Sequence, residues 1–271
     1  MHSLVRQPAV AGRFYPRDRD VLLRDVQSFL SLPVAEPVRA LGCVAPHAGY
    51  IYSGAVAGAV FAQLNVPERC IVLCPNHTGR GQPLAIMSQG SWETPLGTIP
   101  IDTVLAEALK QGFPALTEDS EAHRSEHAIE VQLPFLQTCR KDITFVPIAL
   151  GTGRIEILIK FGEAIADVVR AQPDRLLIVA SSDMNHYESD SVTRKKDQMA
   201  IERMLALDPC SLFDVVKREQ ISMCGFGPVV VMLTAANQLG ASATDLVQYA
   251  TSGDVSGDRD KVVGYAGIIV R

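Results

Sequence analysis

The 271-residue sequence lacks several features that would each assign it to a class of protein. No window holds the roughly 18 consecutive apolar residues that a membrane-spanning helix needs, so we expect no membrane anchor. Basic residues are in deficit, with 25 Lys and Arg against 30 Asp and Glu, and this formal charge of −5 gives no electrostatic reason to expect a nucleic acid partner. The first residues also lack the apolar core of a signal peptide.

Cysteine is sparse and scattered. The cysteines stand singly at positions 43, 70, 74, 139, 210 and 224, without the dense spacing of a disulfide-stapled secreted domain, so we expect a reducing, cytoplasmic location. What the chain does have is an ordinary globular balance of 47% hydrophobic and 20% charged residues, which excludes intrinsic disorder. The length suits one large domain, and we predict a single domain over residues 1–271.

Unbroken apolar runs rich in β-branched residues predict strands of a central sheet that is covered on both faces. These runs are Ala40–Ala45, Cys70–Cys74, Ile143–Leu150, Leu176–Ala180, Leu246–Ala250 and Val262–Val270. Apolar residues three and four apart predict helices between them, at Ala55–Leu64, Thr103–Lys110, Arg154–Arg170, Ser191–Leu205 and Pro228–Gln238. The alternation indicates an α/β fold, with a central mixed, largely parallel sheet flanked by helices.

Three histidines lie just past predicted strands, where a turn begins: His47, His77 and His186. In an open α/β sheet, ligands bind outside the carboxyl ends of the strands. One histidine in a loop is usually an ordinary surface residue, but three in the same position predict a shared site, and imidazole is the commonest neutral metal ligand. Residues 78–100 are predicted to form an irregular excursion or hairpin, of a kind that more often borders a site than fills a core.

Two further histidines, His123 and His127, are four residues apart. We predict that Ser125 caps the N-terminus of a helix, which leaves His123 outside that helix and argues against chelation by the pair. His127, together with Glu126 or Glu130, is predicted to be an acid–base group or to orient a ligand. A helix with a merely charged outer face is the open alternative.

Cys224 is the cysteine that we single out. It lies in a Gly/Pro-rich turn before the predicted Pro228–Gln238 helix, and a thiol near a helix N-terminus has a stabilised thiolate. Cys43, Cys70 and Cys74 lie inside strand runs, where cysteine behaves as a small hydrophobic residue. Two alternatives stay open for Cys224: it is inert like these three, or it serves a metal-free Cys–His hydrolase.

Taken together, these motifs resemble the Memo family, whose bacterial and archaeal members are called AmmeMemoRadiSam system protein B. The resemblance runs nearly end to end. Its motifs are Pro8–Pro16, Ala45-Pro46-His47-Ala48-Gly49-Tyr50, Pro75-Asn76-His77, Glu126-His127-Ala128-Ile129-Glu130, Ser181-Ser182-Asp183-Met184-Asn185-His186, Cys224-Gly225 and Tyr265-Ala266-Gly267.

The resemblance implies a fold similar to that of the class III extradiol ring-cleaving dioxygenases, which hold non-haem Fe(II) with two histidines and one carboxylate. It implies that His47 and His77 are metal ligands and that Cys224 takes the third position, where the dioxygenases have Glu. It further implies that His186 is the acid–base histidine, with Asp183 beside it. Iron or copper binding, redox chemistry, and radical-SAM and AMMECR-type partner proteins are also implied.

A cysteine in place of the carboxylate alters the expected chemistry. Thiolate is a softer ligand and shifts the preference toward Cu(I), Zn or thiolate-ligated iron, and oxidation of Cys224 would compete with catalysis by O₂. We therefore expect a mononuclear 2-His-1-Cys site for Fe(II), with Cu or Zn as alternatives, that acts on an unknown small molecule. His186, Asp183 and His127 are the expected catalytic residues. The alternative is a non-catalytic binding or scaffold protein that uses the pocket for a peptide or protein partner.

Overall fold

The computed structural model describes residues 4–32 and 36–271. Within this part, nine strands form one sheet in the order β10-β12-β2-β9-β3-β8-β4-β7, with β11 also paired to β12, and three form a small sheet in the order β1-β5-β6. The strands are β1 (Val5–Arg6), β2 (Gly42–Ala45), β3 (Arg69–Pro75), β4 (Leu84–Ile86), β5 (Ser91–Thr94), β6 (Gly97–Pro100), β7 (Thr117–Glu118), β8 (Thr144–Leu150), β9 (Leu176–Ser181), β10 (His186–Glu188), β11 (Thr244–Thr251) and β12 (Val262–Val270).

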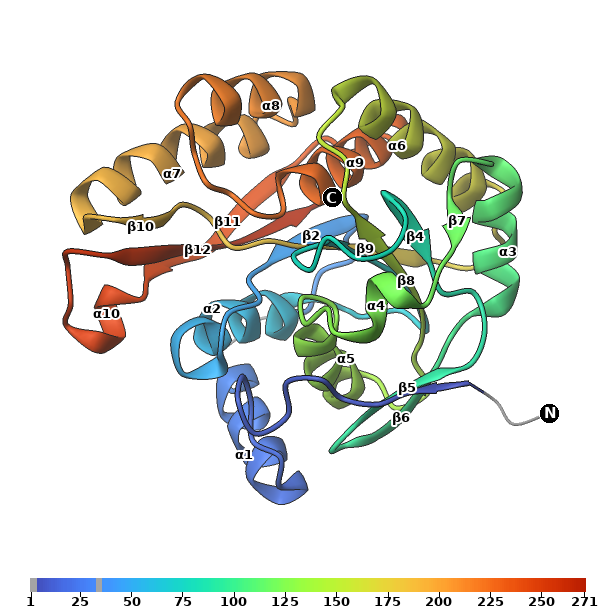
Figure 1. Cartoon of the computed structure of the whole chain (residues 1–271), viewed down its shortest axis with the longest axis horizontal. Helices are drawn as coiled ribbons and strands as arrows, with labels where there is room; N and C mark the ends of the chain where they lie inside the picture. The colour runs from blue at the N-terminus through green and yellow to red at the C-terminus, as the bar shows by residue number, and fades with distance from the viewer. Residues whose placement is uncertain (1–3, 33–35) are drawn as a thin grey trace.

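Helices cover the two faces of the large sheet (Figure 1). They are α1 (Arg19–Leu30), α2 (Tyr50–Gln63), α3 (Thr103–Gly112), α4 (Glu121–Arg124), α5 (Leu133–Cys139), α6 (Ile155–Arg170), α7 (Asp190–Leu205), α8 (Pro209–Arg218), α9 (Phe226–Gln238) and α10 (Gly253–Ser256). One hydrophobic core lies under α3, α6, α7, α8 and α9, and a second lies under α1, α2 and α5. The predicted sheet covered on both faces is therefore confirmed.

The middle of the large sheet is parallel. Strand β9 pairs in parallel with both β2 and β3, and β3 pairs in parallel with β8. Strand β12 is antiparallel to each of its neighbours β2, β10 and β11. The sheet is thus mixed and largely parallel at its centre, as the apolar runs predict.

Side-chain caps fix the beginnings of several helices. Asp18 accepts hydrogen bonds from the backbone amides of Asp20 and Val21 at the start of α1, and Asp102 accepts one from Leu105 in α3. These bonds satisfy amides that a helix N-terminus otherwise leaves unpaired. Helices α1 and α8 were not predicted from the sequence, although Asp208 caps α8 in the same way and Pro209 is its first residue.

Two local predictions need correction. The helix expected at Ala55–Leu64 begins at Tyr50, directly after the His47 turn. Ser125 does not cap the N-terminus of a helix, because it follows the end of α4; a 3₁₀ turn at Glu130–Gln132 and then α5 come later. Residues 78–100 contain the expected hairpin, formed by β5 and β6, with the short strand β4 before it.

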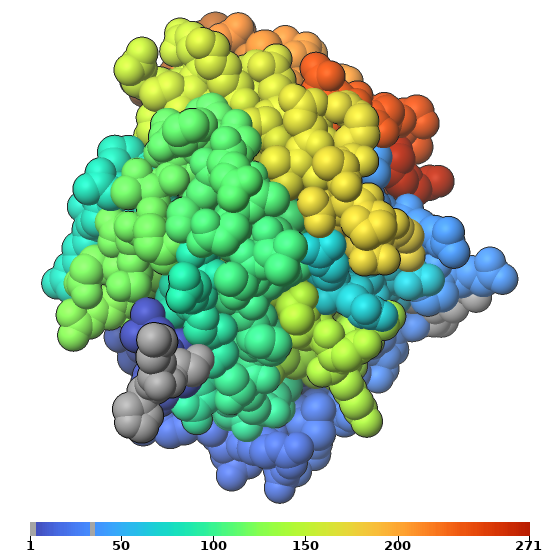
Figure 2. Space-filling view, turned by 90° about the vertical axis from the view of Figure 1, so that its right-hand side faces the viewer, coloured from blue at the N-terminus to red at the C-terminus, as the bar shows by residue number. Residues whose placement is uncertain are grey.

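The N-terminal segment lies against residues far away in the chain. On the face shown in Figure 2, the first described residues (dark blue) lie beside the blue-green residues of the β5–β6 region. This arrangement follows from the parallel pairing of β1 with β5, in which Val5 faces Ser91. None of the helices in the described ranges is both long enough and apolar enough to cross a bilayer.

Candidate metal centre

Three neighbouring parallel strands deliver the candidate residues to one edge of the sheet. Strands β2, β9 and β3 are adjacent, and they lead at their carboxyl ends to His47, to the segment Asp183–His186, and to His77. The turn before α9 brings Cys224 to the same edge, so that its Sγ lies 3.2 Å from His47 Nε2. The metal-binding atoms of His47, His77 and Cys224 all lie within 4.8 Å of one another.

Hydrogen bonds fix the tautomer of His47. The Ser181 hydroxyl donates to the Ala128 carbonyl at 2.7 Å, so at its other contacts its oxygen accepts. His47 Nδ1, 2.9 Å from that oxygen, must therefore carry the proton, which leaves the Nε2 lone pair directed toward Cys224. The ring is 1% exposed, and burial lowers the pKa of His47 to about 3, so the imidazole is neutral and able to bind a metal.

Glu126 orients His77. Its carboxylate accepts hydrogen bonds from the backbone amide of His77 at 2.6 Å and from the His77 ring Nδ1 at 2.9 Å. Burial opposes the charge on this carboxylate, but the hydrogen bond from His77 holds the pKa of Glu126 at about 2. Burial likewise acts to lower the pKa of His77, and the carboxylate outweighs it and raises that pKa. His77 Nε2 is thus left free for a ligand.

His127 completes a cluster of three imidazole rings. Its ring centroid lies 4.7 Å from that of His77 and 5.4 Å from that of His47, and Phe14 packs against it at 4.7 Å. Burial, and after it the proximity of His47, lower the pKa of His127 to about 4. His127 therefore enters the site as a neutral base, which is compatible with the acid–base role that we predicted from the sequence.

A second group of donors, His77, Glu126 and His127, is also compact enough to hold an ion. The hydrogen bonds argue against that use. Besides the two bonds from His77, the Glu126 carboxylate accepts the backbone amides of His127 at 2.9 Å and Ala128 at 3.0 Å. With its lone pairs engaged by four N–H groups, Glu126 orients the imidazoles rather than binding a metal.

Asp183 lies on the loop that follows β9, and His186 is the first residue of β10. Asp183 Oδ1 accepts the backbone amide of His47 at 2.7 Å, and burial raises the pKa of Asp183. His186 is hydrogen-bonded to Ser222, which lies two residues before Cys224. His186 Nδ1 lies 2.8 Å from the Ser222 carbonyl, so that nitrogen carries the proton and Nε2 is free to accept another.

The turn at Cys224 approaches the β9 loop closely because residue 225 is glycine. A Cβ atom at Gly225 would lie 2.4 Å from the Ser181 carbonyl oxygen and from Ser182 Cβ, and its amide donates to Ser182 Oγ at 3.1 Å. Burial and the charge of Asp183 raise the pKa of Cys224 well above its ordinary value. The stabilised thiolate that we predicted from the helix N-terminus is therefore wrong for the metal-free protein.

The remaining candidate histidine lies elsewhere. His123 is fully buried, its ring sits 5.7 Å from that of Trp92, and neither of its nitrogens has a hydrogen-bond partner among the described residues. Arg6 stacks over Trp92 at 4.1 Å and donates to the backbone carbonyls of His123 and Glu126. As we predicted, His123 and His127 do not form a chelating pair, and His123 lies outside the candidate metal centre.

Arg6 also forms a buried ion pair with Glu130. The Glu130 carboxylate accepts further hydrogen bonds from the backbone amides of Ala9 and Val10 and from the Tyr15 hydroxyl. These bonds hold the N-terminal segment against the segment 123–130, which contains Glu126 and His127. The sequence offered no signal for the partner of Arg6, because Glu130 is 124 residues away.

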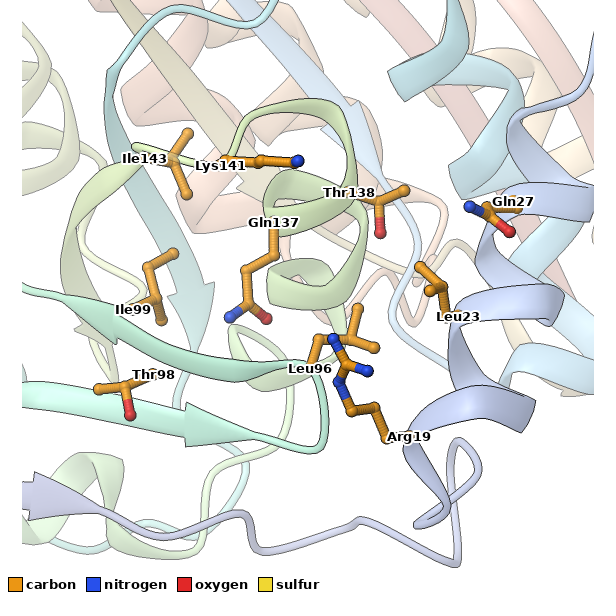
Figure 3. A pocket seen from close by; sticks show the side chains of 10 residues that line it. All are labelled: Arg19, Leu23, Gln27, Leu96, Thr98, Ile99, Gln137, Thr138, Lys141 and Ile143. Atoms are coloured by element: carbon orange, nitrogen blue, oxygen red, sulfur yellow. The ribbon is translucent and has the colours of Figure 1, made fainter.

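The cavities described in the structure lie apart from this cluster. Figure 3 shows one of about 530 Å³ between α1, the β5–β6 hairpin and α5, with Arg19, Leu23, Leu96 and Gln137 among its lining residues. Its walls contain neither histidine nor cysteine. The candidate ligand cluster reaches the surface through His77, whose side chain is 32% exposed.

The geometry agrees with comparisons with known proteins. The family model described as Memo-like protein matches residues 6–269. The chain belongs to the Memo family. Among curated Memo relatives, a MEMO1 family protein of Methanosarcina barkeri is 44% identical over 98% of this chain and all of its own length. Another, of Methanopyrus kandleri, is 42% identical over 98% of this chain and 99% of its own.

A solved structure supports the fold. An uncharacterized protein from Escherichia coli K12 superposes with a TM-score of 0.58 at 14% identity, over 85% of this Memo protein and 100% of that chain. The predicted Memo fold, an α/β layer with a mixed sheet, is thus confirmed. The His-His-Cys group of this Memo protein, in which His47 is buried and His77 is exposed, could hold a metal ion.

Proposed function

We propose that this Memo protein binds one metal ion through His47, His77 and Cys224 and is a non-haem, metal-dependent redox enzyme that acts on a small molecule. The observation that carries the proposal is the convergence of three ligand atoms, from His47, His77 and Cys224. Hydrogen bonds at Nδ1 leave Nε2 of both imidazoles free, and His47 Nε2 lies 3.2 Å from Cys224 Sγ. The family resemblance favours Fe(II) as the ion, and the softer thiolate ligand makes copper and zinc the alternatives.

The donor set fits such an ion without rearrangement of its supports. When bound, iron or copper would supply electron transfer to or from a substrate or oxygen. Because the pKa of Cys224 is raised, the thiol is protonated in the metal-free protein and metal binding would release that proton. His186 Nε2 and the neutral ring of His127 would then accept or return protons, and Asp183 would hold the His47 backbone in place.

Anaerobic reconstitution tests the site. The protein would be loaded separately with Fe(II), Cu(I) and Zn(II), and its metal content measured in the wild type, His47→Ala and Cys224→Ser. We expect close to one ion per wild-type chain and strong loss in both variants. Cys210→Ser, at an exposed cysteine, is the matched control and should bind like the wild type. Equal metal content in all four proteins would overturn the proposal.

A binding or scaffold function is the second candidate. Exposed apolar side chains lie on the segments that follow two site histidines: Ile51 and Tyr52 after His47, and Tyr187, which is 73% exposed, after His186. A scaffold would bind its partner unchanged after Cys224→Ser, whereas an enzyme would lose turnover. The metal-free hydrolase has less support, because it requires a lowered pKa at Cys224 and the structure raises it.

The family resemblance extends the proposal to partners and location. We propose a cytoplasmic protein that works with a radical-SAM protein and an AMMECR-type protein. Co-purification of an affinity-tagged chain from its native host tests this part, since a specific partnership predicts recovery of both proteins. Their absence from repeated purifications would count against the partnership and leave the metal site untouched.

A further inference from the structure

Two loops of the candidate metal centre are joined by side chains that bind no metal. Ser222 lies two residues before Cys224, and Asn185 lies one residue before His186. Asn185 Oδ1 accepts hydrogen bonds from the Ser222 backbone amide at 3.0 Å and from the Ser222 hydroxyl at 3.1 Å. The segment that carries the thiol is therefore bonded directly to the segment that carries the acid–base histidine.

Ser222 returns two bonds to His186. Its hydroxyl oxygen accepts the His186 backbone amide at 2.7 Å, and its carbonyl accepts the ring Nδ1–H at 2.8 Å. One residue thus fixes both the position of the His186 backbone and the tautomer of its ring. Among the described residues, Ser222 alone is hydrogen-bonded to the His186 ring, so the orientation of the ring depends on Ser222.

Asn185 anchors this arrangement to the body of the protein. It is fully buried, its backbone amide donates to Asp197 at 2.8 Å, and its side-chain amide donates to Glu188 at 2.7 Å and to Thr193 at 3.3 Å. Every polar group of the Asn185 side chain has a partner, which leaves a single arrangement available to it. Asp197 and Thr193 belong to α7, so the loop is held by a long helix.

The backbone beside His186 is correspondingly constrained. Tyr187 adopts a φ of 63°, in the left-handed region that a bulky side chain seldom enters, and the pairing of β10 with β12 shifts register at this position. Tyr187 is 73% exposed at this position, whereas His186 is partly buried. Strain of this kind persists only where surrounding contacts impose it, and the bonds from Asn185 and Ser222 are such contacts.

We propose that Ser222 and Asn185 are positioning residues that lock His186 to the Cys224 segment, so that metal binding at Cys224 and the orientation of His186 are coupled. The inference rests on the proposed metal function. Residues that orient a metal site from outside its ligands change metal affinity by about 10- to 100-fold when they are replaced. Because Ser222 is exposed, it can be replaced without opening the core.

The test compares Ser222→Ala, which removes the hydroxyl, with Ser222→Thr, which keeps it. Ser191→Ala is the matched control, since Ser191 is also exposed and its hydroxyl contacts only that of Ser189 in the described structure. Co(II) affinity would be measured from the thiolate-to-metal absorption band, with Cys224→Ser as the blank. Nitrogen-15 NMR of the histidine rings would report the His186 tautomer in metal-free and Zn(II)-loaded protein.

Ser222→Ala keeps the backbone carbonyl that accepts His186 Nδ1–H but loses the hydroxyl that holds the His186 backbone beside that carbonyl, so the ring and the carbonyl no longer stay aligned. We therefore expect this variant to bind Co(II) about tenfold more weakly and to show a mixture of His186 tautomers, with an unchanged thermal midpoint. Ser222→Thr should restore both, and Ser191→Ala should match the wild type. If the wild type shows the Cys224-dependent band while Ser222→Ala keeps its affinity and tautomer, this inference fails and the metal site stands. If the wild type shows no such band, the proposed function fails, and an unchanged tautomer in metal-free Ser222→Ala would overturn the positioning role as well.

Discussion

Two fully buried carboxylates, Glu126 at the metal centre and Asp197 in α7, are held in contrasting ways. Glu126 accepts three backbone amides and the His77 ring, and its pKa falls to about 2. Asp197 accepts one amide and the Tyr249 hydroxyl, and burial raises its pKa to about 7. Burial is common to both, so the hydrogen-bond donors around Glu126, together with the charge of the neighbouring His77, keep that carboxylate charged.

Glu126→Gln should cause the largest loss of stability among the variants considered. In either orientation the glutamine NH₂ would face N–H donors, and buried groups left unpaired in this way destabilise a protein strongly. We expect the free energy of unfolding in urea to fall by about 3 to 5 kcal/mol. Metal affinity should fall with it, because His77 would lose the acceptor that orients it. A variant as stable as the wild type would show that the carboxylate charge is unimportant here.

Asp197→Asn should remove a pH dependence of stability that is opposite in sign to that expected from Glu126. An acid whose pKa is raised in the folded state binds its proton more tightly there, so the wild type should lose stability as pH rises from about 4 to about 7. Three pKa units correspond to about 4 kcal/mol. The asparagine variant should lack this slope and exceed the wild type in stability at pH 8. Parallel stability curves for the two proteins between pH 4 and 8 would contradict the raised pKa.

Gly264→Ala tests how tightly the Asp197 carboxylate is confined. A Cβ atom at Gly264 would lie 1.8 Å from Asp197 Oδ2, and overpacking of this kind costs about 1 to 3 kcal/mol. We expect a loss of about 2 to 3 kcal/mol by chemical denaturation. Gly153→Ala is the control, because its nearest neighbour would be 3.7 Å away. Similar stability for the two variants would mean that the carboxylate has room to move.

The smallest effect is expected for Glu121→Gln. Glu121 pairs with Arg124 at 3.3 Å, but both side chains are more than half exposed. Exposed ion pairs contribute about 0 to 1 kcal/mol, so stability should change by less than about 0.5 kcal/mol. Glu121 lies only five residues before Glu126 in the sequence. Comparing Glu121→Gln with Glu126→Gln therefore shows whether burial and hydrogen-bond donors, rather than position in this segment, determine the loss of stability. A loss comparable with that of Glu126→Gln would remove the distinction.

The sequence predicted those parts of the fold and site that repeat a local pattern. Unbroken apolar runs located the central strands, and the position of His47, His77 and His186 just past strand ends predicted their convergence, because parallel strands end at one edge. Membership in the Memo family then supplied the expectation that Cys224 joins them. The tautomers of His47, His77 and His186 could be assigned only from the structure, because they depend on the hydrogen-bond acceptor at each Nδ1.

The supports of the site could not be predicted in the same way. Glu126 bonds to His77 across 49 residues and Ser222 bonds to Asn185 across 37, and no periodic signal links such positions. The error at Ser125 has a related cause, since long-range bonds to Glu126 and Glu130, rather than a helix cap, set the local backbone. Polar contacts between distant segments appear only when the topology is known.

The position of β12 has a consequence for how the protein is made. This last strand, Val262–Val270, lies between β2, β10 and β11, and β10 contains His186. A chain that is being synthesised from its N-terminus therefore has no partner for the strand at His186 until β12 has been added, about 75 residues later. A chain truncated before β12 would leave β10 unpaired and would lose this support of His186. The candidate site is thus completed only after β12 has joined the sheet.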